Sequence, residues 1–134
     1  MTPDIHGIDH IHVYARDRAA AEAWYRRVLG LVRVPELESW SPGRGPLTIA
    51  NAAGTLKLAL FERAEVMPGS VIALGVDADS FLQWRAHLRQ ELGKQPEAVD
   101  HDLSWSMYFL DPDGNGYEIT SYDYAALKMR LAQD

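Results

Sequence analysis

Residues 7–15 (GIDHIHVYA) alternate between apolar and polar side chains, and this period of two predicts a β-strand with one apolar face. Ile11 and Val13 fall on the apolar face. The opposite face carries His10, His12 and Tyr14. The strand therefore presents a row of polar rings away from the core.

A helix is predicted directly after this strand. Asp17 suits the N-cap position, and Gly30 suits the C-cap position at the far end. Between them, apolar side chains recur at intervals of three and four residues, which predicts one buried helix face. These residues are Ala21, Trp24, Tyr25, Val28 and Leu29.

The same order recurs in the second half of the chain. Residues 71–76 (VIALGV) predict a strand, Asp79 is the predicted N-cap, and Gly93 ends the helix. The apolar positions of this helix are Phe81, Trp84, Leu88 and Leu92. Shorter strands are expected at 31–38, 46–51, 55–62, 98–103, 105–110 and 116–122.

The predicted fold class is α+β, with two tandem βαβββ modules that form curved mixed sheets around a cleft. Turn-forming residues at 65–70 separate the modules, which cover about 5–64 and 69–123. A C-terminal helix is expected at 124–131, and the whole chain is expected to form one domain. Clefts between repeats are favoured ligand sites.

Strand alternation indicates which side chains leave the helix-covered face and line the cleft. Five of these side chains could bind a ligand or take part in a reaction, namely Lys57, Phe61, Tyr108, Glu118 and Tyr122. Glu118 lies between the core residues Tyr117 and Ile119, so its carboxylate needs a polar partner.

Composition narrows the function classes. The chain of 134 residues has no cysteine, which excludes disulfides and thiolate chemistry. Its formal net charge of -6 argues against a nucleic-acid partner. We expect no membrane partner, because no apolar run reaches the roughly 20 residues of a span. The N-terminus lacks a signal-peptide pattern, so a cytoplasmic location is expected.

Two stretches, DHIHVYARDRAAAEAWYRRVLGL and WSMYFLDPDGNGYEI, resemble the vicinal oxygen chelate superfamily. That superfamily includes glyoxalase I, fosfomycin-resistance transferases, extradiol dioxygenases and bleomycin-resistance proteins. The resemblance covers nearly the whole chain, including its repeat. It implies the fold, but the superfamily places unrelated reactions on one scaffold.

The resemblance also implies one divalent metal ion, with ligands from the first and last strands of each module. His10 and Glu118 match two of these positions. The third falls on Lys57 or Ala59 and the fourth on Val71, and none of these ligates readily. The metal would be Fe, Mn, Ni or Zn, which accept imidazole and carboxylate ligands.

Two further histidines are candidates for the remaining roles. His12 lies on the same strand face as His10, as a third ligand or a proton-transfer group. His101 resembles a substrate-facing histidine of extradiol dioxygenases, which implies acid/base chemistry. The resemblance also implies a homodimer, in which a partner chain can complete the site.

These observations give one main hypothesis and one alternative. The main hypothesis is a metal-dependent lyase or dioxygenase that acts on a small substrate with two neighbouring oxygens. Tyr108, Phe61 and Tyr122 would shape its pocket, and Lys57 would face an anionic group. Glyoxalase and fosfomycin-transferase activities proper are disfavoured. The alternative is a metal-free sequestration protein of the bleomycin-resistance type.

Overall fold

A computed structural model describes residues 1–133, which form two compact units that meet in sequence between Met67 and Pro68. Each unit contains one sheet with a helix on it. The strand and helix order of the predicted βαβββ repeat is confirmed in both.

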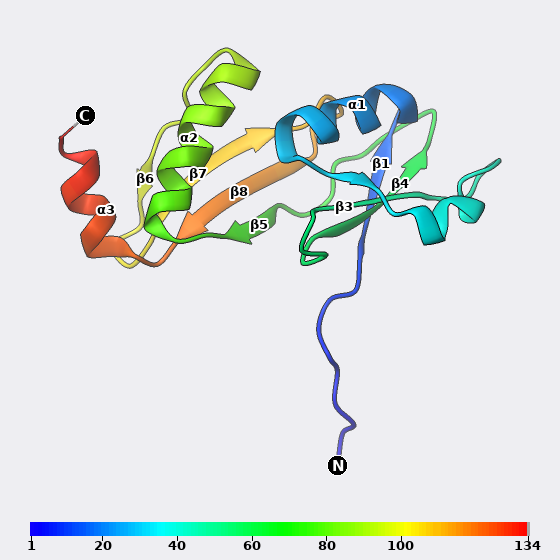
Figure 1. The fold of residues 1–134 in the computed structure, drawn as a ribbon, viewed down its shortest axis with the longest axis horizontal. Helices are drawn as coiled ribbons and strands as arrows, with labels where there is room; N and C mark the ends of the chain where they lie inside the picture. The colour runs from blue at the N-terminus through cyan, green and yellow to red at the C-terminus, as the bar shows by residue number, and fades with distance from the viewer. Residues whose placement is uncertain (134) are drawn as a thin grey trace. The chain divides into compact units, whose positions relative to one another are not determined.

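Unit 1 contains a four-stranded mixed sheet in the order β1-β4-β3-β2. β1 pairs with β4 in parallel, and the other pairs are antiparallel. The helix α1 packs against β4 (Figure 1). The elements are β1 (Ile11–Ala15), α1 (Arg18–Leu29), β2 (Val32–Arg33), the 3-10 helix η1 (Pro35–Trp40), β3 (Leu47–Ala50) and β4 (Lys57–Glu62).

The start and the end of α1 follow the predicted capping. The Asp17 carboxylate accepts a hydrogen bond from the backbone N–H of Ala20, and Gly30 adopts a left-handed conformation with φ of 70°. All five predicted apolar positions of this helix are buried. Because β-carbons at these spacings share one helix face, burying that face on the sheet fixes the orientation of α1.

The strand predicted at 31–38 is much shorter in the structure. Only Val32 and Arg33 pair with β3, and η1 begins at Pro35. Proline has no backbone N–H to donate to a sheet, and its fixed φ suits the first position of a helix. The chain therefore leaves the sheet early and forms a short helix beside β3.

Unit 2 repeats this architecture with the sheet order β5-β8-β7-β6, in which β5 and β8 are parallel. The helix α2 packs against β8, and α3 contacts α2 (Figure 1). The elements are β5 (Ile72–Gly75), α2 (Ala78–Leu92), β6 (Val99–Asp100), β7 (Trp105–Leu110), β8 (Gly116–Ser121) and α3 (Tyr124–Leu131).

The predicted N-cap of α2 was wrong by two residues. Asp77, not Asp79, accepts the capping hydrogen bond, from the backbone N–H of Ser80. Asp79 lies in the first turn, where it forms an ion pair with Arg130 of α3. Both aspartates suit a helix start, and only the backbone conformation selects between them.

The predicted strand faces are confirmed. Leu58 and Leu60 of β4 have no exposed surface, nor do Met107 of β7 and Tyr117 of β8. The alternate residues point to the other face of each sheet, away from α1 in unit 1 and from α2 in unit 2. None of the helices in residues 1–133 combines the length and apolar character that a bilayer span requires.

Candidate functional site

The helix-averted face of unit 1 carries the two predicted histidines. His12 lies in β1 opposite Ala59 of β4, and Ala59 lies opposite Thr48 of β3. These three side chains form one row across the sheet. His10 lies one residue before the first residue of β1, because the strand begins at Ile11 rather than at the predicted Gly7.

This face contains a pocket of about 290 Å³. The row from His12 to Thr48 forms part of it, together with His10 and Lys57. The remaining lining residues are Asp9, Leu37, Trp40 and Pro46. The pocket thus combines imidazole, carboxylate and ammonium groups with an apolar wall from η1 and the segment that follows it.

His10 is held between Asp9 and His12. Its Nδ1 lies 2.8 Å from the Asp9 carboxylate, and its Nε2 lies 3.2 Å from Nε2 of His12. A carboxylate only accepts hydrogen bonds when ionised, so Nδ1 of neutral His10 carries the proton. Nε2 of neutral His10 is then unprotonated. It accepts a hydrogen bond from His12 here, and it is the atom that can bind a metal ion.

Lys57 is one of the residues that line this pocket. Its strand β4 is internal to the sheet rather than at an edge. The Lys57 ammonium lies 3.7 Å from Asp9, and its side chain is only 28% exposed. The hydrogen bond from His10 and the Lys57 charge lower the pKa of Asp9, which keeps this carboxylate ionised.

Aromatic rings extend the same face beyond the pocket. Phe61 of β4 contacts the ring of His12 at 4.8 Å between centroids and that of Tyr14 at 5.8 Å. The Arg63 guanidinium lies 5.2 Å from the centroid of the Phe61 ring. Phe61 therefore packs beside the His12 ring without being one of the residues that line the pocket.

Glu118 occupies the corresponding face of unit 2. It lies in β8 between Ala73 of β5 and Tyr108 of β7. The Ser106 hydroxyl donates a hydrogen bond of 2.6 Å to the Glu118 carboxylate. Glu118 thus has the polar partner that its position between two core residues requires, and Ser106, which is fully buried, fixes its orientation.

His101 and Tyr108 form a second pair on unit 2. Nε2 of His101 lies 2.9 Å from the Tyr108 hydroxyl. The loop that carries His101 turns at Asp102, which has φ of 68°, a left-handed value that aspartate adopts more readily than most other non-glycine residues. Asp100 stabilises this loop by accepting hydrogen bonds from the backbone N–H of Asp102 and from the Tyr124 hydroxyl.

The Asp100–Tyr124 contact predicts a pH dependence of stability. The hydrogen bond from the backbone of Asp102 and then that from Tyr124 lower the pKa of Asp100, and Asp100 raises the pKa of Tyr124. The Asp100 contribution is complete above its usual pKa of 3.8 and is lost as pH falls through the lowered value. The Tyr124 contribution is complete below 10.0 and is lost as pH rises through the raised value.

We therefore expect Tyr124→Phe to lower the urea midpoint most between these limits. The difference from the wild type should shrink in stronger acid and in stronger base. Tyr122→Phe is the control, because the Tyr122 side chain is exposed beyond the end of β8. A midpoint difference that does not change with pH would contradict the assignment.

Each unit thus assembles its own group of predicted site residues. Unit 1 brings together His10, His12 and Lys57, with Phe61 beside them. In unit 2, Glu118 and Tyr108 are cross-strand neighbours, and His101 contacts Tyr108; Tyr122 is 78% exposed and stands apart from this pair.

Sequence reasoning missed two supporting residues, Asp9 and Ser106. Asp9 directly precedes His10, and strand alternation already placed Ser106 on the face of Glu118. Both signals were present in the chain. Neither residue type is distinctive in the sequence, so only the contacts in the structure reveal their roles.

The strand registers also settle which residue of unit 1 corresponds to Glu118. Glu118 lies opposite Ala73 of the first strand of unit 2, and Ala59 lies opposite His12 of the first strand of unit 1. Ala59 rather than Lys57 therefore holds the equivalent position. An alanine side chain has no donor atom, so it cannot supply the ligand that the resemblance implies here.

The donors that remain are suited to a divalent ion in composition. His10 and His12 supply two imidazoles 3.2 Å apart, close to the separation of about 3 Å that two neighbouring ligands have on one ion with metal–nitrogen bonds of about 2.1 Å. In unit 2, Glu118 offers a carboxylate, which is also a ligand type that such ions accept. Over residues 1–133, no three His, Asp or Glu side chains lie together in a group that could hold a metal ion.

Residues 7–119 match the model of the glyoxalase/bleomycin resistance protein/dioxygenase superfamily. The chain belongs to this superfamily. The match spans both units and confirms the resemblance inferred from the two sequence motifs. No curated protein sequence matches the chain.

Solved structures of this superfamily's fold resemble the chain at low identity. FosX, a fosfomycin resistance protein from Listeria monocytogenes, is 18% identical with a TM-score of 0.68, and the alignment covers 98% of this chain and all of FosX. A glyoxalase/dioxygenase from Nostoc punctiforme is 19% identical with a TM-score of 0.68, covering 91% and 95%.

A third structure is an integron cassette protein from the mobile metagenome of the Halifax Harbour sewage outfall. It is 16% identical with a TM-score of 0.70, and the alignment covers 87% of this chain and 99% of that protein. One FosX structure contains Mn(II) and a dihydroxypropylphosphonic acid. At these identities the likeness establishes the fold, and function rests on the residues of this chain.

Proposed function

We propose that this protein is a divalent-metal-dependent enzyme of the lyase or dioxygenase type, and that it acts on a small substrate with neighbouring oxygens. The observation that carries the proposal is the imidazole pair of His10 and His12, with Asp9 on Nδ1 of His10. This arrangement leaves Nε2 of His10 as a metal-binding atom. The Mn(II) in FosX supports a metal in this superfamily.

His10 and Glu118 are the proposed ligands, and His12 is the proposed third ligand. A bound ion would polarise the substrate oxygens as a Lewis acid. Asp9 would keep His10 in the ligating tautomer, and Ser106 would hold the Glu118 carboxylate in place. Lys57 would attract an anionic oxygen into the pocket of unit 1.

The pair of His101 and Tyr108 supplies proton transfer in this proposal. With Nε2 of neutral His101 unprotonated, the Tyr108 hydroxyl donates to it, and the imidazole can accept that proton. Tyr108 lies opposite Glu118 on the neighbouring strand, so the phenol and the proposed ligand share one face.

Metal content tests the proposal. Protein stripped with a chelator is titrated separately with Mn(II), Fe(II), Ni(II) and Zn(II), and bound metal is measured after gel filtration. We expect about one ion per chain for at least one of these metals, because the donor set suits first-row ions. Protein that takes up none of the four would reject the metal-dependent enzyme.

A metal-free binding protein is the second candidate. Ala59 stands at the position equivalent to Glu118, and Val71 stands where a second-module histidine is expected, so two ligand positions are lost. Failure to bind metal, together with ligand binding in the pocket of unit 1, would favour this function. Such a protein would use the pocket for sequestration alone.

A further inference from the structure

The pocket of unit 1 has one apolar wall, made by Leu37 and Trp40 of η1 and by Pro46. Trp40 is 55% exposed, although tryptophan side chains are usually well buried. Across the sheet, Lys57 presents the ammonium group of the same pocket. A flat apolar surface and a cation, which lies 3.7 Å from the Asp9 carboxylate, therefore share one small cavity.

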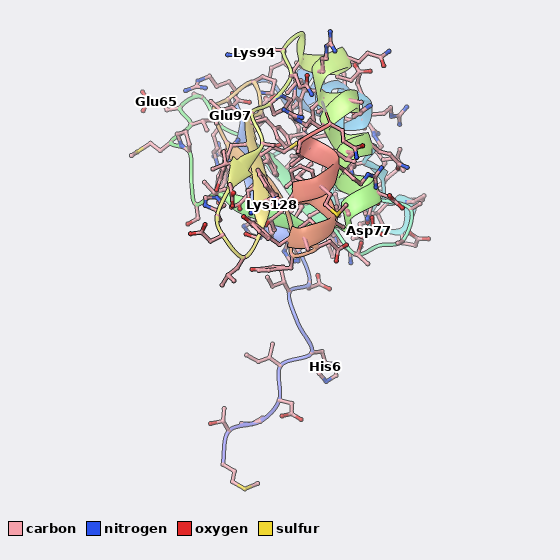
Figure 2. The ribbon with its side chains drawn as sticks, turned by 90° about the vertical axis from the view of Figure 1, so that its left-hand side faces the viewer. His6, Glu65, Asp77, Lys94, Glu97 and Lys128 are labelled. Atoms are coloured by element: carbon pink, nitrogen blue, oxygen red, sulfur yellow. The ribbon has the colours of Figure 1, made fainter. Side chains whose placement is uncertain are left out.

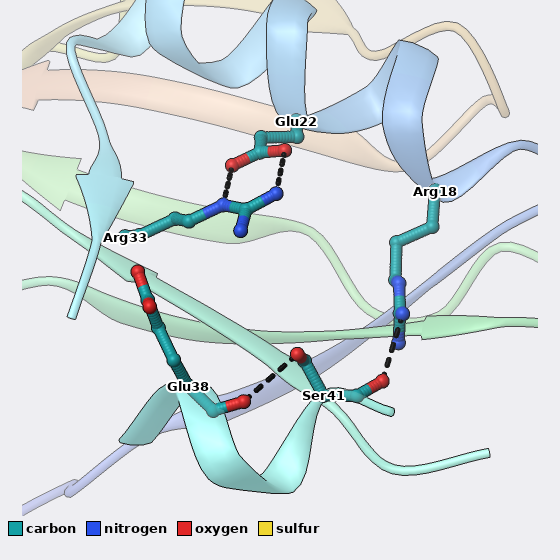
Figure 3. Close-up of polar contacts among 5 residues, drawn as sticks. All are labelled: Arg18, Glu22, Arg33, Glu38 and Ser41. Carbon is teal, nitrogen blue, oxygen red and sulfur yellow. Dashed lines mark hydrogen bonds and ion pairs between the residues drawn. The ribbon is translucent and has the colours of Figure 1, made fainter. Parts of the chain in front are cut away.

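Arg18, the first residue of α1, forms hydrogen bonds with the segment that joins Trp40 to Pro46. Its Nη1 donates to the carbonyl of Gly45 at 2.6 Å, and its Nη2 donates to the carbonyl of Ser41 at 2.8 Å. Figure 3 shows Arg18 reaching from the helix to Ser41. One guanidinium thus joins both ends of the turn with charge-assisted hydrogen bonds.

The turn itself transmits this restraint to Trp40. The Ser41 hydroxyl donates to the carbonyl of Glu38, and Gly45 packs so closely on Trp40 that an added β-carbon would overlap the Trp40 carbonyl oxygen. The backbones of Gly45 and Trp40 are therefore in close contact. Arg18 contacts no lining atom of the pocket in these hydrogen bonds, yet it fixes the backbone that carries the wall.

A neighbouring arginine provides a natural comparison. Arg33 of β2 donates to the Glu22 carboxylate at 2.5 and 3.0 Å, and Figure 3 shows this pair beside α1 and apart from the Arg18 contacts. It carries the same charge on the same side of the helix. Its hydrogen bonds run to a side chain of α1 rather than to the turn.

We propose that the pocket of unit 1 binds the flat apolar part of a small anion against Trp40, and that Arg18 is the residue that positions this wall. The inference deepens the proposed function, since the anion would be its substrate. A flat ring would lie on the indole, and its anionic group would meet Lys57. A wall that is already ordered loses no conformational entropy when the ligand binds. The Arg18 contacts therefore contribute to affinity.

Naphthalene carboxylate is a suitable probe, because it combines a flat ring with one anionic group. Chelator-stripped protein labelled with fluorotryptophan is titrated by fluorine NMR, and the Trp40 resonance is assigned with Trp40→Phe. We expect a saturable shift of that resonance. Arg18→Ala should raise the dissociation constant about tenfold, and Lys57→Gln should also weaken binding.

Amide exchange and chemical rescue separate positioning from a general loss of stability. In Arg18→Ala, exchange of the amides at 41–46 should accelerate, while that of β3 and β4 stays unchanged. Millimolar ethylguanidinium should restore probe affinity and ethylammonium should not, because only a planar fork reaches both carbonyls. Arg18→Lys serves if the alanine variant does not fold, and it should show a partial loss.

Three results would overturn the inference. Unchanged exchange and unchanged affinity in Arg18→Ala would remove the role of Arg18, as would an equal effect of Arg33→Gln. If the Trp40 fluorine resonance of the wild type does not shift on titration, the proposal that the pocket binds a flat anion is rejected. The probe titration uses metal-free protein. A negative titration therefore does not affect the metal-content test, and a negative metal-content test does not affect the titration.

Discussion

Replacing His10 with alanine is expected to reduce bound metal from about one ion per chain to a tenth or less. Loss of a residue that only supports a ligand weakens metal binding about 10- to 100-fold, so loss of the ligand itself should cost at least as much. Glu118→Gln should have a comparable effect, because a neutral amide is a weak ligand for these ions. Metal analysis after gel filtration at one fixed metal concentration measures both.

Matched controls make this result specific. His6→Ala removes a histidine from the extended segment before β1, and Glu97→Gln removes a carboxylate from an exposed loop of unit 2 (Figure 2). Neither should change the metal content. Full metal retention by the His10 and Glu118 variants would reject these two ligands, even if the wild type binds metal.

Asp9→Asn adds a graded test of the support for His10. The amide can still meet Nδ1 of the ring, but it removes the negative charge that favours the ligating tautomer. Metal affinity should therefore fall by about 10- to 100-fold, less than for His10→Ala. An affinity equal to that of the wild type would show that Asp9 plays no part in metal binding.

Leu58→Ala is expected to destabilise the protein by about 2–5 kcal/mol, the usual cost of truncating a buried leucine. Leu58 lies in β4, has no exposed surface and faces the helix-covered side of the sheet. Domains of this size have about 5–15 kcal/mol of stability in total, so the change would be a large fraction of it. Urea unfolding followed by circular dichroism provides the measurement.

The control for this prediction is the same substitution at an exposed position. Leu103→Ala should change the free energy of unfolding little, because Leu103 is 79% exposed. If Leu58→Ala were equally mild, the assignment of β4 faces from alternation would be wrong. The residues on the opposite face, including Lys57, would then need to be reassigned.

Local patterns predicted much of the fold. The period of two in β1 and β8 and the helical spacing in α1 each reflect burial of one face, and burial is what the structure shows. Predictions failed where the local signal was shared or incomplete. Asp77 and Asp79 both suit an N-cap, and residues 31–38 contain Pro35, which ends the strand pairing and begins a helix.

The candidate site was predictable only in part. Alternation placed His10, His12 and Glu118 on the helix-averted faces, because side-chain direction along a strand follows from the backbone alone. The contacts of His10 with Asp9 and of Glu118 with Ser106 depend on rotamers and on strand register. Register also identified Ala59 as the equivalent of Glu118, which spacing left open between two residues.

By itself, the sequence determined the repeated βαβββ order, the buried face of each element and the superfamily, because these follow from short-range periodicity and contiguous motifs. The tertiary structure alone decided that η1, Pro46 and Lys57 enclose one pocket with the two histidines, and that Arg18 holds its wall. The two Arg18 contacts join residues 23 and 27 positions apart in the sequence. Only the paired strands and the packed helix bring such residues together.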